Sequence, residues 1–274
     1  MSTTTDQERE FYDDTYAVHL SRPDHELKVS HAVMDRALSD PAQTVWERRR
    51  LYGAVLDCLL AEPLDGARVL DYGCGPGEWG VLLATLGAEA TLLDLSPKAI
   101  ELGLRRASAS GVAERVRGVA RDATDLSCFE TGAFDLIFGS AAVHHTLKYG
   151  DAFAELLRVL KPGGKMVLAE TLGNNPVLNA ARRVRAALSR EPEEQGEEII
   201  IGDAEIELLR SRFAQVTVTP MNLLAMSKRL FRGRFHLRAV RSTIGALEAA
   251  DSVLIRAVPP LEKYCGEALI VAVK

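Results

Sequence analysis

The chain has 274 residues, enough for one large α/β domain with a modest addition or for two small domains. Its formal charge of −5 gives no general attraction to nucleic acid, and no apolar run approaches the ~20 residues that a membrane helix needs. The start, MSTTTDQERE, has no basic segment followed by an apolar run, so we expect no secretory signal. The four cysteines are scattered, which favours a reduced, cytoplasmic protein with neither disulfides nor zinc.

Residues 1–65 are predicted to be helical and to pack as a cap on the domain that follows. After a break at Asp40-Pro41, the stretch WERRRLYGAVLDCLL places apolar residues at helical spacing. Tyr12 and Tyr16, in EFYDDTYAVHL, are candidates for a lid over a pocket. An amphipathic helix with buried aromatic side chains explains the two tyrosines equally well.

From residue 66 the pattern changes to strands that alternate with helices. Ser96 and Pro97 form a good N-cap and N1 pair for one of these helices. Alternation of this kind implies right-handed crossovers and a mostly parallel sheet that is covered on both faces. The predicted strands are 67–73, 90–96, 115–123, 134–141 and 165–171, and the helices between them are 78–87, 98–110 and 151–160, the last ended by KPGG.

After Thr171 the alternation is interrupted. Residues 172–210 are predicted to be helical and highly charged, and we interpret the acidic run at 191–198 as an exposed loop. Strand character resumes at 213–220 and in the terminal GEALIVAVK. The basic, amphipathic stretch at 227–241 could contact an anionic membrane, a nucleic acid or a dimer partner, although a solvated helix face is the commoner outcome.

Two overlapping glycine patterns occur in RVLDYGCGPGEWG. Gly75, Gly77 and Gly80 satisfy the dinucleotide fingerprint G-x-G-x-x-G. With Asp71 and Gly73 before them, the first two of these glycines also satisfy D-x-G-x-G-x-G. Glycines after a strand let the backbone approach a ligand, and the next helix adds N–H groups with partial positive charge. That environment suits a pyrophosphate and a methionine carboxylate equally.

Asp71 favours the second pattern. Its carboxylate would repel a pyrophosphate at the mouth of the site, and it would attract the ammonium and the sulfonium of S-adenosylmethionine (SAM). Asp94, at the end of the second strand, can accept hydrogen bonds from the ribose hydroxyls of either cofactor. The simpler interpretation is that each acid only caps a turn or a helix.

Residues 66–171 resemble a class I SAM-dependent methyltransferase, in the branch that methylates small molecules. The matching pieces, in the family's order, are VLDYGCGPG, the acid in LLDLS, RDATDL, FDLIFGSAAVHH and LKPGGKMVLAE. The resemblance implies an α/β, Rossmann-like, doubly wound sheet of seven strands, six parallel and the last antiparallel. The chain would then divide into a helical cap or lid at 1–65 and a SAM-binding domain at 66–274, with a helical substrate-recognition insertion at 172–210.

The resemblance also implies which residues bind. The cofactor contacts would be Asp71, Gly73, Cys74 and Gly75 at the methionine end, Asp94 at the ribose, Leu95, Asp122 and Ala123 at the adenine, and Ser140 beside the methionine portion or the transferred methyl. Tyr16 and His145 would complete the cofactor pocket, and the acceptor would meet Tyr12, Asn174, Asn175 and Arg182. Solvated helix charge explains the arginine at least as well.

Methyl transfer requires an acceptor held roughly 3–3.5 Å from the methyl carbon. His144 or His145 could serve as a base, since histidine titrates near neutral pH, and His145 could equally pack against the cofactor. We therefore expect a SAM-dependent methyltransferase that acts on a small organic acceptor and releases S-adenosylhomocysteine (SAH). Oxygen is the favoured acceptor atom, with nitrogen and carbon as alternatives, in secondary-metabolite biosynthesis.

Two other functions remain open at this point. One is a SAM-binding protein that catalyses a cyclisation, a rearrangement or a decarboxylation. The other is an NAD-linked oxidoreductase, which Asp71 and the lack of a second catalytic domain disfavour. We expect no nucleic-acid partner, no stable membrane insertion and no metal, and a homodimer is an open option.

Overall fold

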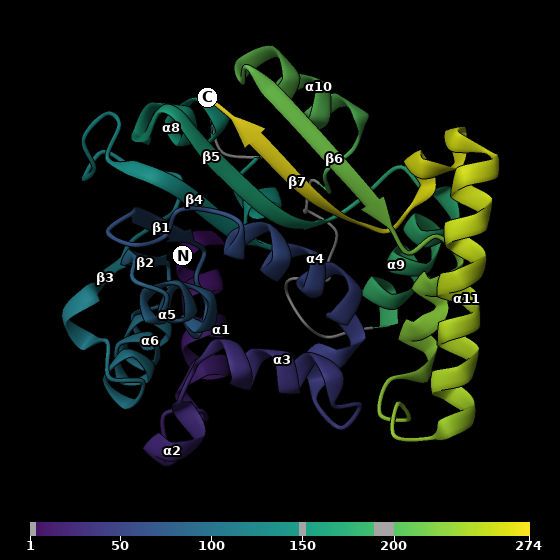
Figure 1. The fold of residues 1–274 in the computed structure, drawn as a ribbon, viewed down its shortest axis with the longest axis horizontal. Helices are drawn as coiled ribbons and strands as arrows, with labels where there is room; N and C mark the ends of the chain where they lie inside the picture. The colour runs from purple at the N-terminus through teal and green to yellow at the C-terminus, as the bar shows by residue number, and fades with distance from the viewer. Residues whose placement is uncertain (1–3, 148–151, 189–199) are drawn as a thin grey trace.

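A seven-stranded sheet forms the middle layer of the computed structural model, which describes residues 4–147, 152–188 and 200–274 (Figure 1). The strand order is β3-β2-β1-β4-β5-β7-β6, and β7 runs antiparallel to both of its neighbours. The strands are β1 (Arg68–Tyr72), β2 (Glu89–Asp94), β3 (Val116–Ala120), β4 (Phe134–Ser140), β5 (Leu160–Thr171), β6 (Gln215–Met221) and β7 (Glu267–Val273). The predicted doubly wound sheet with an antiparallel last strand is confirmed.

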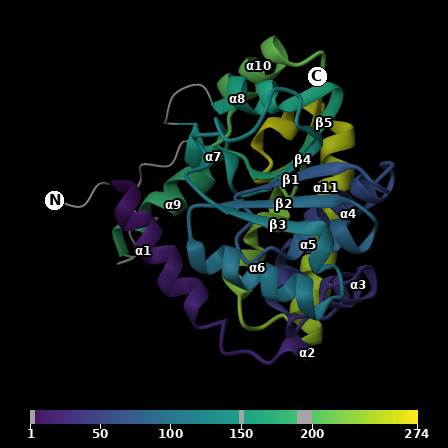
Figure 2. The same ribbon diagram turned by 90° about the vertical axis from the view of Figure 1, so that its left-hand side faces the viewer.

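Helices cover both faces of this sheet (Figures 1 and 2). The segment before β1 contains α1 (Thr4–Ala17), α2 (Asp24–Leu27), α3 (His31–Ser39), the 3₁₀ helix η1 (Thr44–Arg48) and α4 (Arg49–Leu60). The central helices are α5 (Glu78–Thr85), α6 (Pro97–Ala109), η2 (Ala113–Arg115), α7 (Val143–Thr146) and α8 (Ala152–Val159). After β5 come α9 (Pro176–Leu188), α10 (Asp203–Arg212), η4 (Leu224–Phe231), α11 (Arg238–Ala257) and η5 (Pro259–Tyr264). The acidic run at 191–198 lies outside the described residues.

Each face of the sheet has its own apolar core, because successive side chains of a strand point to opposite faces. Val69 of β1 packs with α3, α4, α5 and α6 on one face. Leu70, the next residue, packs with α7, α8 and α10 on the other. The helices before β1 therefore share a core with the sheet, and Leu51, Val55 and Leu59 of α4 are fully buried in it.

β5 begins earlier than the strand predicted at 165–171. The preceding helix ends at Val159, as KPGG predicts, but the chain then enters the sheet directly. Leu160 pairs with β4, the register shifts, and Gly163 turns with a φ of +74° while its N–H donates to the carbonyl of Lys274. KPGG is thus an irregularity within a strand.

The N-terminus of α6 ties α1 to the body of the protein. Ser96 caps α6 as predicted, since its hydroxyl oxygen accepts from Ala99 N at 3.0 Å. The same hydroxyl donates to Asp13 Oδ1 of α1, and Lys98 N donates to that oxygen at 3.2 Å. Asp13 therefore anchors the helix that carries Tyr12 and Tyr16.

Replacing Asp13 with alanine should loosen α1 without unfolding the protein. The loss of two hydrogen bonds at the α6 terminus costs at least about 1 kcal/mol, or at least about fivefold in the local opening equilibrium. Limited proteolysis within α1 should accelerate by that factor, while the urea midpoint changes little. Asp14→Ala, an exposed neighbour, is the control; equal cleavage rates in both variants would contradict the anchoring role.

Candidate functional site

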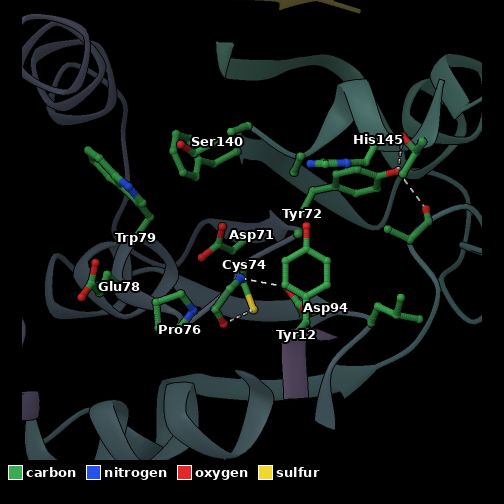
Figure 3. Close-up of a pocket in the computed structure, with 18 of the residues that line it drawn as sticks. Tyr12, Asp71, Tyr72, Cys74, Pro76, Glu78, Trp79, Asp94, Ser140 and His145 are labelled. Atoms are coloured by element: carbon green, nitrogen blue, oxygen red, sulfur yellow. Dashed lines mark hydrogen bonds between the residues drawn. The ribbon is translucent and has the colours of Figure 1, made fainter. Parts of the chain in front are cut away.

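A cavity of about 370 Å³ opens at the carboxyl ends of β1, β2, β3 and β4, and residues of α1 contribute to its lining (Figure 3). It includes the point between β1 and β4 where the strand order reverses, which is the usual ligand site of such sheets. Figure 3 shows Asp71 and Asp94 on one side, with Ser140 and His145 opposite. The predicted residues that line it are Tyr12, Tyr16, Asp71, Gly73, Cys74, Gly75, Asp94, Leu95, Asp122, Ala123, Ser140 and His145.

The carboxylate of Asp71 is buried at the floor of this cavity, with the residue only 2% exposed. Its Oδ2 accepts from Gly80 N at 2.8 Å. This approach needs a glycine, because a Cβ at residue 80 would lie 2.9 Å from that oxygen and 2.3 Å from Leu92 Cδ2. Burial raises the pKa of Asp71 to about 7, although the Gly80 N–H acts to lower it. A cation in the cavity would therefore stabilise the ionised acid.

Asp94 holds the glycine loop in place. Its Oδ2 accepts from Gly75 N at 2.8 Å, and its Oδ1 accepts from Ser96 N at 2.9 Å. Burial raises the pKa of Asp94 against the lowering effect of these donors. Each carboxylate oxygen can accept a further bond, so the side chain can anchor the loop and still bind a ligand. A Cβ at Gly75, whose φ is +50°, would lie 2.9 Å from the Tyr16 hydroxyl, so α1 lies close to this loop.

The loop after β3 is fixed from two sides. Asp122 Oδ1 accepts from both the backbone N and the hydroxyl of Thr124, at 2.9 and 2.7 Å. The hydroxyl of Tyr72, at the end of β1, donates to the carbonyl of Ala123 at 2.9 Å. These bonds hold Asp122 and Ala123 at the cavity edge before any ligand binds.

The two histidines of the HH pair have different surroundings. His145 lines the cavity, whereas His144 lies behind it with its Nδ1 2.7 Å from Glu170 Oε2. Glu170 is fully buried, and its Oε1 accepts from Ala142 N and Val143 N at 3.3 and 3.0 Å. The rings of the two histidines are in contact, with centroids 4.2 Å apart. Of the two, His145 has the position from which a side chain can reach a ligand.

Three predicted acceptor-binding residues do not line the cavity. Asn174 Nδ2 donates to Asp203 at 2.7 Å, and Asn175 Nδ2 donates to the carbonyl of Tyr264, also at 2.7 Å. Arg182 Nη2 donates to a backbone carbonyl just after β5 at 3.0 Å. These bonds brace α9, and acceptor binding by the three side chains stays a prediction.

The sequence analysis missed an aromatic and hydroxyl wall. Tyr52 of α4 places its hydroxyl 3.1 Å from Ser140 Oγ, and Arg48 Nη1 donates to that hydroxyl at 3.0 Å. The ring of Trp79 meets Tyr52 edge-on at 5.4 Å and contacts Phe138 at 5.0 Å. The spacing of Arg48 and Tyr52 indicates that they share one helix face, but nothing local shows that this face meets the cavity.

Two kinds of feature, a metal-ligand group and a membrane-spanning helix, are absent from the part of the chain that the structure describes. No group of three or more His, Cys, Asp or Glu side chains there could hold a metal ion. No helix within 4–147, 152–188 and 200–274 combines the length and the apolar character that crossing a membrane needs. The four cysteines are free thiols.

Residues 69–164 match the model of a methyltransferase domain family. Demethylmenaquinone methyltransferase of Clavibacter sepedonicus is 38% identical over 108 residues, which cover 39% of this chain and 42% of that protein. A ubiquinone biosynthesis O-methyltransferase of Xanthomonas oryzae pv. oryzae is 35% identical over 123 residues, 45% of this chain and 50% of that protein. The chain thus spans about half the length of these curated relatives.

The solved structure of geranyl diphosphate C-methyltransferase from Streptomyces coelicolor A3(2) is similar over 99% of this chain and 98% of that one. Its TM-score is 0.62 at 18% identity, so this likeness concerns the fold. Three observations point to the same kind of domain: the matched family model, the strand order, and the acid beside the glycine loop. Together they identify residues 69–164 as a methyltransferase domain on a Rossmann-like sheet.

Proposed function

We propose that the protein transfers the methyl group of SAM to a small organic acceptor. The observation that carries this proposal is the buried carboxylate of Asp71 beside the glycine turn. A diphosphate at this turn would meet that acid, whereas the ammonium of SAM would pair with it. Gly73 and Gly75 leave room for the methionine portion, so the residues present fit the cofactor.

The rest of the cavity suits an adenosine. Asp94 has the remaining acceptor capacity to bind the ribose hydroxyls. Leu95 would pack against the adenine, and Asp122 would accept from its amino group. Tyr16, close above Gly75, would cover the bound cofactor with the rest of α1.

When bound, SAM supplies an electrophilic methyl group. The protein's own contribution would be to align the acceptor, which can lower a barrier by about 7–11 kcal/mol, and to exclude water. Ser140, Tyr52 and His145 provide polar atoms on the opposite wall of the cavity. His145 would take the proton of an oxygen acceptor, a step that typically adds about 10²–10⁴-fold.

A cavity of about 370 Å³ that α1 helps to line suits a molecule-sized acceptor better than a protein or an RNA. The curated relatives are named for demethylmenaquinone methylation and ubiquinone biosynthesis, which supports a small organic acceptor. We propose oxygen as the first choice of acceptor atom, nitrogen or carbon as the others, and a role in secondary metabolism.

Thermal unfolding with SAM, SAH and NAD tests the cofactor. A ligand at 100 times its Kd stabilises a protein by about 2.7 kcal/mol, so SAM and SAH should raise the melting temperature and NAD should not. Incubation with SAM and a panel of phenols, amines and enols should then release one SAH per methylated product. A melting shift with NAD alone would refute the proposal, and conversion of an acceptor without SAH would indicate a non-methylating reaction.

Replacing Asp94 with alanine should weaken SAH binding at least tenfold. The ribose loses its acceptor and Gly75 N loses its anchor, and tenfold corresponds to about one net hydrogen bond. Titration calorimetry measures the Kd, and circular dichroism checks the fold. Asp125→Ala, in the same family motif as Asp122 but outside the cavity lining, should bind normally. An unchanged Kd in Asp94→Ala would remove this residue from the site.

Alanine variants of the two histidines should separate their roles. His145→Ala should lower kcat by about 10²-fold or more with little change in SAM affinity. His144→Ala leaves the buried Glu170 without its side-chain partner, so its free energy of unfolding should fall by about 1–3 kcal/mol. Steady-state kinetics and urea unfolding measure the two effects. A fall in SAM affinity as large as the fall in kcat would make His145 a wall residue and not a base.

A further inference from the structure

A group of charged side chains, here named the cationic cluster, lies where η1, α4, η4 and the start of β7 meet. The sequence predicts a solvated face for the basic stretch at 227–241, but the structure turns part of that stretch inward, and Lys228 is 0% exposed. The members of the cationic cluster are Arg48, Lys228, Arg229, Arg232, Glu47 and Glu267.

Glu267, fully buried at the start of β7, faces three cations. Its Oε2 accepts from Lys228 Nζ at 2.9 Å and from Asn222 Nδ2 at 2.6 Å. Its Oε1 lies 3.6 Å from Arg48 Nε and 4.0 Å from Arg229 Nη2 without a hydrogen bond. One carboxylate is therefore shared by three cations, and it accepts a hydrogen bond from only one of them, Lys228.

Among the residues that the structure describes, the cationic cluster has more cations than carboxylates. Its other carboxylate, Glu47, is engaged by Arg232 Nε and Nη2 at 2.6 and 2.9 Å. Within the described residues four cations thus face two carboxylates, or three when Glu170, whose charge also acts on Arg48, is counted. Burial lowers the pKa of Lys228 and that of Arg229, although the neighbouring glutamates act to raise them. Buried charge of this kind is costly unless a counter-charge is present.

One edge of the Arg48 guanidinium makes no hydrogen bond to the described residues. Its Nη1 donates to Tyr52, whereas its Nε and Nη2 are buried without a hydrogen-bond partner among the described residues. Nε and Nη2 form one side of the guanidinium. That side is the fork that binds two oxygens of a carboxylate or a phosphate with parallel hydrogen bonds.

This edge lies one side chain behind the wall of the cofactor cavity. Tyr52 bonds to Arg48 on one side and to Ser140 on the other, and both Tyr52 and Ser140 line the cavity. Arg48 also lines a second cavity between η1 and the segment after η4, together with Glu47 and Arg232. A group bound at Arg48 would thus lie on the far side of Tyr52 and Ser140 from Asp71.

We propose that the acceptor carries an oxyanion, a carboxylate or a phosphate, which binds the Nε–Nη2 edge of Arg48 with Lys228 and Arg229 nearby. The proposal rests on the proposed function, because it names the charge class of that site's acceptor. An oxyanion satisfies both nitrogens that have no hydrogen-bond partner among the described residues, and it adds negative charge beside Arg48, Lys228 and Arg229. It also anchors one end of the acceptor near Ser140 and Tyr52. The alternative is that the cationic cluster binds no ligand and only stabilises the fold, with Arg48 hydrogen-bonding to Glu267 Oε1.

Titration calorimetry with saturating SAH tests the proposal, with benzoate and inorganic phosphate as probes and neutral benzamide as the comparison. Benzoate or phosphate should bind at least tenfold more tightly than benzamide, and the better probe identifies the oxyanion. Arg48→Met should weaken that binding at least tenfold. Arg48→Lys keeps the charge but loses the two-pronged guanidinium edge, so its affinity for the anion should lie between that of wild type and that of Arg48→Met. Arg238→Met removes an exposed charge at the start of α11 and should change nothing.

Measuring SAH binding in the same variants distinguishes failure of the oxyanion proposal from failure of the proposed function. Arg48 does not line the cofactor cavity, so all variants should bind SAH with the same Kd. Normal SAH binding without anion binding, or anion binding equal in Arg48→Met and Arg238→Met, would overturn the oxyanion site and leave the methyltransferase proposal standing. Failure of wild type to bind SAH or SAM would instead contradict the proposed function. If Arg48→Met does not fold, Arg48→Lys gives the decision.

Discussion

The hydrogen bond between Gly80 N and the Asp71 carboxylate is the contact on which the site depends. It joins the end of β1 to the first turn of α5, and it is possible only because residue 80 has no Cβ. The acid is thereby buried at the floor of the cavity, where its pKa rises to about 7. Its charge then depends on what occupies the cavity. A cationic ligand gains a partner there, and a diphosphate does not.

The two sides of the site differ in charge. Asp71 and Asp94 are acids beside the glycine loop, whereas Arg48 bonds to Tyr52 from behind and shares Glu267 with Lys228 and Arg229. In the proposed complex the positive cofactor binds beside the two acids, and the oxyanion end of the acceptor binds beside the cations, with Tyr52 and Ser140 between these two charged ends. Electrostatic complementarity of this kind favours the orientation in which the cofactor lies beside the acids and the oxyanion lies beside the cations over the reverse orientation.

Local patterns predicted much of this site, and distant contacts decided the rest. The acid and glycines of β1, Asp94 at the end of β2 and the Ser96 cap depend on short spacings that can be read in sequence. The position of Tyr52 depends on how α4 packs against β5 and β7, which no local spacing shows. Likewise, the sequence of the basic stretch predicts a solvated helix face. The buried partner of Lys228, Glu267, lies 39 residues away in sequence, so local spacing gives no sign that Lys228 turns inward.

The most direct test of the central claim is the number of protons released when SAH binds. A carboxyl whose pKa is raised to about 7 is largely protonated at about pH 6, and pairing with the SAH ammonium ionises it. Calorimetry in two buffers of different ionisation enthalpy should therefore show proton release at about pH 6 that approaches one per SAH and fades above about pH 8. Asp71→Asn should release much less. Binding at about pH 6 with no proton release in wild type would contradict the account.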